Sequence, residues 1–251
     1  MSQRLRLLIE YDGRPFYGWQ RQDGQPTVQG ALERAAAALN GGEPVLVQGA
    51  GRTDAGVHAT GQVAHLTLST PRPVRKLPDA LNYHLRPNPI AVLAVEEVDE
   101  SFHARFSATG RAYRYLIQTR RAHLTFDRGL VWRTPFDLDV HAMQEAAQYL
   151  LGEHDFTTFR DAACQAKSPV KTLDTLEVFR LADRIEITTT ARSFLHRQVR
   201  SITGSLVEVG RGMHEPGWVK EILEARDRTA CGPVAPADGL YLERVMYDEE
   251  I

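Results

Sequence analysis

Apolar and polar residues follow one another in short segments that predict strands interleaved with helices. Residues 4–11, RLRLLIEY, first alternate and then become continuously apolar, as in a strand that enters a core. The next periodic segment predicts a helix over residues 28–40, with Thr27 as its N-terminal cap and Gly41 and Gly42 at its end. The rest of the first half predicts strands at 45–49, 62–69 and 90–98 and a helix at 77–85.

The second half repeats this order of elements without repeating the residues. Strands are expected at 111–119 and 129–133, a helix at 139–151 closed by Gly152, a hairpin of 171–181 and 184–190 around Ala182 and Asp183, helices at 194–209 and 218–226, and a last strand at 240–247. The order β-α-β-β-α-β is that of the ferredoxin-like unit. The sequence therefore predicts an α+β fold of two ferredoxin-like halves, 1–105 and 106–251, with the junction within 101–110. The halves are expected to share a central antiparallel sheet, with helices on one side and a cleft on the other.

Composition sets limits on the class of protein. A chain of 251 residues with 43% hydrophobic content is long enough to bury a sizeable core. No apolar run approaches the roughly 18 residues of a membrane span. The first residues, MSQRLRLLIEYDG, interleave charges with apolar side chains and predict neither a signal peptide nor an anchor. Cys164 and Cys231 lack metal-ligand spacing, which predicts two reduced thiols in a cytoplasmic protein.

The positive charges are unevenly distributed, although the net charge is only −2. The span 105–133 holds seven arginines and a single acid, Asp127, with Phe106, Tyr113 and Tyr115 among the arginines. Arginine interleaved with aromatic residues is typical of phosphate contact combined with base stacking. The alternative for this span is a solvated strand face.

The segment GAGRTDAGVHATGQ, residues 49–62, presents one carboxylate among many glycines. It matches neither the dinucleotide fingerprint, whose third glycine would fall on Asp54, nor a P-loop, because Gly56 is followed by Val57. Asp54 beside Arg52 indicates chemistry on a ligand, since a nearby cation keeps a carboxylate ionised. The alternative is an aspartate that only bonds the backbone of a turn. His58 has no partner at ligand spacing, which favours a packed or capping residue over a general base.

Two further pairs of residues are candidates by position. Tyr113 and Tyr115 point to the same side of their strand, and strand propensity alone explains them adequately. Arg197 and Arg200 are i, i+3 neighbours on one face of a predicted helix, as on many helix surfaces.

Six segments in order make the sequence similar to a known family across essentially the whole chain. They are EYDG…FYGWQRQ (10–22), GAGRTDAGVHATGQVAH (49–65), FHARFSATGRAYRY (102–115), LLGEHDFTTF (150–159), SFLHRQVRSITGSLVEVGRG (193–212) and APADGLYLERVMY (235–247). This set closely resembles the tRNA pseudouridine synthase A family, and the run Arg-Thr-Asp-Ala-Gly-Val-His-Ala is its most specific part.

The resemblance implies an activity and a role for each matching residue. Members of the family isomerise uridine at positions 38, 39 and 40 of the tRNA anticodon stem-loop, which requires no cofactor and no metal. The matching residues are Asp54 as nucleophile, Arg200 as its ionic partner, Tyr113 as a stacking residue suited to proton transfer, Arg52 in extrusion of the target nucleotide, and Leu240 against the flipped uracil. The glycines around Asp54 would let the flipped nucleotide approach it.

The resemblance also implies partners and a compartment. The basic span would follow the RNA backbone, with Arg105, Arg111, Arg114 and Arg121 as contacts in an RNA-binding cleft. The family works as a homodimer, with each tRNA spanning both subunits, and the protein is expected in the cytoplasm. Two alternatives stay open: an N-glycosidic hydrolase that uses paired carboxylates, and a non-catalytic RNA-binding module.

Overall fold

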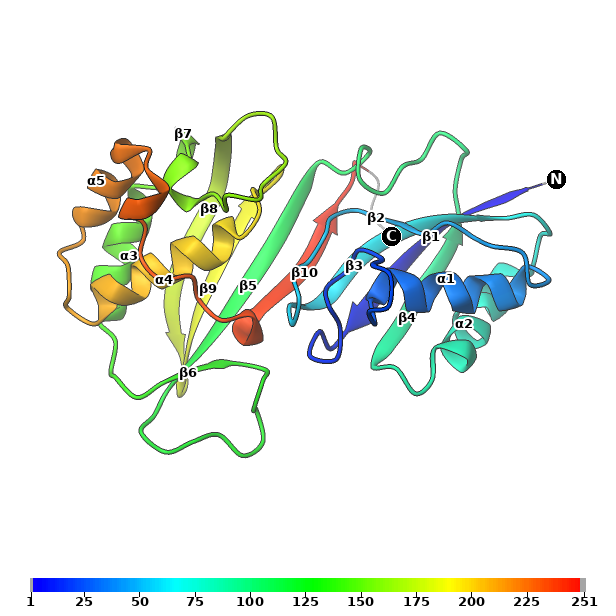
Figure 1. The fold of residues 1–251 in the computed structure, drawn as a ribbon, viewed down its shortest axis with the longest axis horizontal. Coiled ribbons are helices and arrows are strands. Elements are labelled where there is room, and N and C mark those ends of the chain that lie inside the picture. The colour runs from blue at the N-terminus through cyan, green and yellow to red at the C-terminus, as the bar shows by residue number, and fades with distance from the viewer. Residues whose placement is uncertain (1, 249–251) are drawn as a thin grey trace. The chain divides into compact units, whose positions relative to one another are not determined.

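A computed structural model describes residues 2–248 and divides the chain into two compact units (Figure 1). The first unit consists of the residues up to Thr109 together with those from Tyr241 onward. The second unit is Gly110–Leu240. The last strand therefore belongs mostly to the first unit, whereas the sequence pattern predicts it as the last element of the second half.

The first unit is built on a sheet that carries the candidate loop between two of its strands. The strands are β1 (Gln3–Tyr11), β2 (Gln48–Gly49), β3 (His58–Leu68), β4 (Ile90–Glu97) and β10 (Leu240–Met246). β1 lies between β3 and β4 and is antiparallel to both, and β2 is antiparallel to β3. β10 runs parallel to β3, with Tyr241 opposite His58. The strand expected at 45–49 is shorter than predicted, and the one expected at 62–69 begins earlier.

Two helices cover this sheet, and both lie where the sequence predicts them. They are α1 (Val28–Leu39) and α2 (Leu77–Leu85), with a short 3₁₀ turn, η1 (Val74–Lys76), before α2. The hydroxyl of Thr27 accepts a hydrogen bond from the Gly30 N–H, which confirms the predicted cap. α1 packs against α2, and α2 packs against β4. The buried side chains of these helices and strands include Leu7, Ile9, Val28, Leu32 and Ala64.

His65 of β3 is a buried histidine that makes the stability of the first unit depend on pH. Its side chain is 4% exposed, and its Nδ1 accepts a hydrogen bond from the Ala104 N–H at 3.0 Å. Burial lowers the pKa of His65 from 6.5 to about 4, and the neighbouring charges of Arg4 and His103 add to the effect. The unfolded chain therefore takes up this proton below pH 6.5, whereas the folded chain takes it up only near pH 4.

We expect His65 to lower the free energy of unfolding by about 3 kcal/mol as the pH falls from 6.5 to 4. His65→Asn keeps an acceptor near the position of Nδ1 but does not titrate. Urea unfolding of both proteins at several pH values measures the contribution as their difference. An equal loss of stability in the variant would contradict the assignment to His65.

The second unit has its own, mostly antiparallel strands. They are β5 (Gly110–Thr119), β6 (Trp132–Thr134), β7 (Gly152–Asp155), β8 (Val170–Leu181) and β9 (Arg184–Ala191). β9 lies between β5 and β8, β7 pairs with β8, and all three pairings are antiparallel, while β6 runs parallel to β5. The predicted hairpin is confirmed, and Ala182 in its turn has a positive φ of 53°. β7 is a strand that the sequence pattern did not predict.

The helices of the second unit are α3 (Val140–Gln148), α4 (Gln198–Gly210) and α5 (Trp218–Ala225), with 3₁₀ turns η2 (Thr157–Phe159), η3 (Arg228–Ala230) and η4 (Ala237–Gly239). α3 packs against β8, α4 and α5. The prediction that the long helix begins at Phe194 is wrong, because Arg197 adopts a left-handed conformation with φ 59°. The helix begins at Gln198, whose side chain accepts a hydrogen bond from the Leu195 N–H in the preceding loop.

The predicted α+β class, a mostly antiparallel sheet with helices, is confirmed. The boundaries 1–105 and 106–251 and the RNA-binding cleft stay predictions. Within residues 2–248, no helix is long and apolar enough to cross a membrane. Neither Cys164 nor Cys231 forms a disulfide.

Candidate active site

Asp54 lies in a loop between β2 and β3 whose backbone is fixed by hydrogen bonds. Its side chain is half-exposed and follows the exposed Arg52 and the buried Thr53 in the chain. The Thr53 carbonyl accepts a hydrogen bond from the Trp19 N–H at 3.0 Å, and the Asp54 carbonyl accepts one from the Val57 N–H at 3.1 Å. The backbone that carries this half-exposed carboxylate is thus held at Thr53 and at Asp54 itself.

Two buried side chains support this loop from the sheet. The hydroxyl groups of Tyr11 and Thr53 lie 2.8 Å apart in a hydrogen bond. Burial raises the pKa of Tyr11 to about 12, against the opposing effect of this bond, so the phenol stays neutral at physiological pH. The Gln62 amide donates to the carbonyl of Gly51 at 3.0 Å. These two supports come from β1 and β3, so regular structure helps to hold the loop.

Most glycines of the loop have a structural reason. Gly56 adopts a positive φ of 79°, which side chains rarely tolerate. A Cβ on Gly49 would lie 2.6 Å from the Trp19 ring, and one on Gly61 would lie 2.1 Å from the Glu243 carbonyl oxygen. Gly51 differs, because no atom lies within 4 Å of a Cβ built there. The interpretation that the glycines admit a nucleotide therefore stays a prediction for Gly51, whereas the other three have a reason within the fold.

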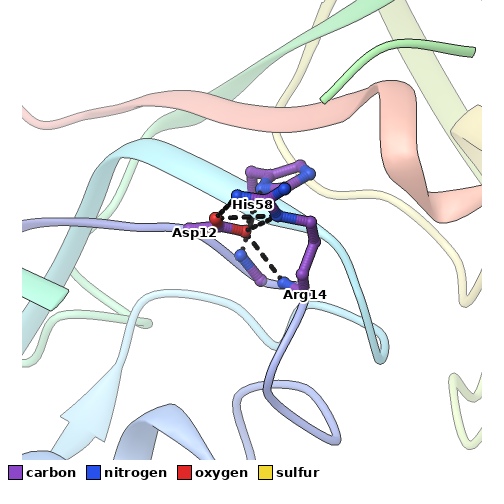
Figure 2. Close-up of polar contacts among 4 residues, drawn as sticks. Asp12, Arg14 and His58 are labelled. Carbon is purple, nitrogen blue, oxygen red and sulfur yellow. Dashed lines mark hydrogen bonds and ion pairs between the residues drawn. The ribbon is translucent and has the colours of Figure 1, made fainter. Parts of the chain in front are cut away.

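His58 is a packed residue, as its sequence context favoured. It is 1% exposed, and its ring stacks on that of Tyr241 at 4.7 Å between centroids and 20° between planes. Its Nδ1 accepts a hydrogen bond from the Gly13 N–H at 3.0 Å. Figure 2 shows the imidazole beside Asp12, whose carboxylate also faces the Arg14 side chain. A buried ring whose Nδ1 lone pair is already used does not fit the general-base interpretation.

Tyr113 and Tyr115 of β5 differ in burial and partners. Tyr113 is half-buried, and its ring meets the edge of Phe194 at 5.1 Å. Tyr115 is fully buried and donates its hydroxyl hydrogen to the Pro236 carbonyl at 2.7 Å. Tyr113 therefore has the exposure that a contact with a ligand requires, whereas Tyr115 is part of the core. Phe194 was not singled out in the sequence, because its contact with Tyr113 spans 81 positions.

The segment of residues 231–240 contacts Arg200 and ends at Leu240. Arg200 of α4 is half-buried and donates from Nε to the Ala235 carbonyl at 2.8 Å, while the Ala235 N–H donates to the Arg200 carbonyl. Leu240 is 5% exposed. The segment approaches α4 closely, since a Cβ on Gly204 would lie 1.6 Å from the Pro233 carbonyl oxygen. Arg200 is therefore fixed in the second unit by backbone contacts that the sequence pattern did not reveal, and Leu240 is buried.

The predicted RNA-contacting arginines lie in different surroundings. Arg105 and Arg121 are exposed, and Arg114 is half-buried. Arg111 is 8% exposed and donates from Nη1 to the Arg192 carbonyl at 2.8 Å. Arg111 thus ties β5 to the segment after β9, and the exposed Arg105 and Arg121 are better placed for phosphate. The Arg105 guanidinium lies 5.7 Å from the centroid of the Phe106 ring, which is 75% exposed, and Phe126 of the same basic span is 93% exposed.

The candidate residues are shared between the two units. Arg52, Asp54 and Arg105 belong to the first unit, and Arg111, Tyr113, Arg114, Arg121, Arg200 and Leu240 belong to the second. Among residues 2–248, no group of three or more His, Cys, Asp or Glu side chains is arranged to hold a metal ion. Each unit by itself presents one part of the predicted set, a carboxylate in the first and an aromatic ring with a guanidinium in the second.

Comparison with known proteins finds matching segments in both units of the chain. The sequence model of the family described as tRNA pseudouridine synthase matches residues 7–107 and 146–248. Proteins named tRNA pseudouridine synthase A from Hyphomonas neptunium and Maricaulis maris are 67% and 61% identical to this chain, over 97% of its length and 98% of theirs. The match defines an isomerase that acts on RNA. The chain belongs to the tRNA pseudouridine synthase family, so the predicted family and enzyme class are confirmed.

Proposed function

We propose that this protein converts uridine to pseudouridine at positions 38, 39 and 40 of the tRNA anticodon stem-loop, with Asp54 as the nucleophile. One observation carries the assignment to Asp54. Its carboxylate is half-exposed, whereas Thr53 and Val57 of the same loop are buried and hydrogen-bonded. A carboxylate nucleophile divides a difficult displacement into two easier steps through a covalent intermediate. Such a nucleophile needs a fixed direction of attack, which the loop backbone supplies.

The reaction moves one bond and exchanges one proton. The N1–C1′ bond of uridine breaks, the uracil turns, and a C5–C1′ bond forms, after which C5 loses its hydrogen and N1 carries one. No electrons are lost or gained overall, so the isomerisation itself requires no redox cofactor. Asp54 forms a covalent bond to the substrate, and this bond breaks again before pseudouridine is released, which regenerates the carboxylate. Tyr113 stacks on the uracil and takes part in proton transfer at C5.

The remaining site residues have supporting roles. We propose that Arg200 keeps the Asp54 carboxylate ionised, because a guanidinium lowers the pKa of a carboxylate beside it. Its bond to the Ala235 carbonyl limits the positions that the guanidinium can reach. Arg52, exposed two residues before Asp54, fills the space that opens when the target nucleotide flips out. Leu240 packs against the flipped uracil.

The positions modified test the substrate assignment. Purified protein is incubated with tRNA transcripts that carry uridine at only one of positions 38, 39 and 40, and pseudouridine is located at single-nucleotide resolution. The proposal expects modification of each transcript, and no modification where all three positions are cytidine. Pseudouridine formed elsewhere in the tRNA would contradict it.

Product mass separates the proposal from the hydrolase alternative. Isomerisation leaves the mass of the RNA unchanged, whereas an N-glycosidic hydrolase releases free base. A non-catalytic RNA-binding module would bind the tRNA and leave its composition unchanged. Nucleoside analysis of one reaction therefore distinguishes all three functions.

We further propose that the protein works as a homodimer in the cytoplasm, with each tRNA spanning both subunits. This extension is supported by the family to which the chain belongs. Sedimentation of the free protein and of its tRNA complex tests it, with a dimer expected in both. A monomer that modifies tRNA at full rate would contradict it.

Exposed arginines predict that tRNA binding weakens steeply with salt. Replacing one phosphate-binding arginine with glutamine should reduce the slope of log K against log salt by about 0.7–0.9. We expect the Arg105→Gln, Arg121→Gln double variant to have a shallower slope than the wild type. Arg75→Gln, in η1 and outside the basic span, serves as the control. Equal slopes in the wild type and the double variant would show that Arg105 and Arg121 do not contact the RNA backbone.

A further inference from the structure

Residues 11–14 contact the Asp54 loop on both sides of Asp54. We propose that this segment clamps the loop, and that His58 is a positioning residue whose Nδ1 atom helps to fix the direction of the Asp54 carboxylate. The proposal rests on the proposed role of Asp54 as nucleophile. Tyr11 and His58 act through the loop backbone and do not touch the uridine.

The contact before Asp54 is made by Tyr11. Its side chain is 4% exposed, and its hydroxyl is hydrogen-bonded to that of Thr53, itself 7% exposed. A buried hydroxyl that loses its partner costs more than the bond contributes on average. The bond therefore resists any movement of Thr53, the residue that precedes Asp54 in the chain.

The contacts after Asp54 are made by Gly13. Its N–H donates to Nδ1 of His58 at 3.0 Å. A Cβ on Gly13 would lie 2.1 Å from the Val57 carbonyl oxygen, so the two backbones touch. Val57 in turn donates its N–H to the Asp54 carbonyl. Gly13 is thus connected to Asp54 through Val57 by direct backbone contacts.

Asp12 and Arg14 complete the clamp beside His58, as Figure 2 shows. The Arg14 side chain donates to both carboxylate oxygens of Asp12, and the Arg14 backbone N–H donates to Oδ1 at 3.0 Å. Partial burial of Asp12 is outweighed by these bonds, which lower the pKa of its carboxyl below the ordinary value. The same Oδ1 lies 3.3 Å from Nδ1 of His58. An ionised, bonded Asp12 holds the backbone turn that presents the Gly13 N–H.

His58 contributes a hydrogen-bond acceptor in this arrangement. Because Nδ1 accepts from Gly13, the neutral imidazole carries its hydrogen on Nε2. Stacking on Tyr241, the residue opposite His58 in the β3–β10 pair, fixes the plane of the ring. The clamp needs an acceptor at the position of Nδ1, and it does not need a group that takes up a proton.

Two amide substitutions separate these requirements. An asparagine amide oxygen can occupy the position of Nδ1, whereas a glutamine amide extends toward the position of Nε2. We expect His58→Asn to retain kcat within about tenfold of the wild type, and His58→Gln and His58→Ala to lose about a hundredfold, since a misplacement of about 1 Å has that effect. The dissociation constant for tRNA should change less than about twofold in all three, because binding energy arises elsewhere. His84→Gln, an exposed histidine of α2, is the matched control.

Several outcomes would overturn the clamp. They are full activity in His58→Gln, an Asn variant as impaired as the Gln variant, and a loss that appears in tRNA affinity instead of kcat. A general base at His58 would inactivate the Asn and Gln variants alike. If the wild type forms no pseudouridine, or Asp54→Asn keeps its turnover, the proposed function fails instead.

Amide hydrogen exchange gives a readout that does not depend on catalysis. The clamp predicts faster exchange of residues 52–57 in His58→Gln and in Tyr11→Phe than in the wild type, with His58→Asn close to the wild type. Exchange in α3, in the second unit, should be unchanged and shows that the variants are folded. Identical exchange of the loop in wild type and His58→Gln would refute the clamp.

Discussion

Replacing Asp54 with asparagine is expected to reduce pseudouridine formation to background while tRNA binding survives. Asparagine preserves the volume of the side chain and most of its hydrogen bonding, but it removes the negative charge and the nucleophilic oxygen pair. A covalent step that depends on this carboxylate then has no substitute within the loop. The loop itself should stay in place, because its supports are Tyr11, Gln62 and Gly13 rather than Asp54 alone.

Single-turnover rates and tRNA affinity are measured on the same preparation. Asp79→Asn, the same change in the first turn of α2, controls for the loss of one charge. Turnover by Asp54→Asn above about a thousandth of the wild-type rate would argue against nucleophilic catalysis.

The second large effect is expected at Tyr113, where stacking and proton transfer can be separated. Stacking needs only an aromatic face, whereas proton transfer needs the phenol. Tyr113→Phe also keeps the edge contact with Phe194, so the ring should hold its position. We expect this variant to bind tRNA nearly as well as the wild type and to release pseudouridine about two to four orders of magnitude more slowly. Tyr113→Leu should in addition weaken binding by roughly 1–3 kcal/mol, because leucine offers no aromatic face for stacking.

Tyr115→Phe, two positions along the same strand, is the matched control. It loses the hydrogen bond to the Pro236 carbonyl, which should lower the free energy of unfolding by about 1 kcal/mol and leave the proton transfer unaffected. Near-normal turnover in Tyr113→Phe would reduce Tyr113 to a stacking surface, and another group would have to remove the C5 proton.

Local signals predicted most of the elements, and long-range contacts explain the differences. Thr27 and the period of the following residues were sufficient for α1, and α2 lies at its predicted bounds. α4 begins later than predicted because Arg197 is left-handed and its side chain is bonded to Asp161, 36 residues away. The parallel pairing of β10 with β3 joins distant parts of the chain, and no periodicity within either strand encodes it.

In the candidate site, too, local signals could be seen in the sequence and long-range contacts could not. Asp54 and Arg52 could be singled out from the loop at residues 49–62, because their types and spacing are unusual there. The hydrogen bond between Gly13 and His58 spans 45 positions in the chain. The buried Arg111 donates to the carbonyl of Arg192, which lies on another segment. Sequence alone therefore indicated which side chains carry charge or an aromatic face, but it could not show which of them are used to hold the backbone.

The most direct test of the central claim is tritium release from tRNA that carries 5-³H-uridine in the anticodon stem-loop. C5 loses its hydrogen only when the C5–C1′ bond of pseudouridine forms, so the signal reports the isomerisation itself. We predict that the wild type releases one tritium for each pseudouridine formed at constant RNA mass, and that Asp54→Asn releases none above background. Release of free uracil, or equal tritium release by Asp54→Asn, would contradict the account.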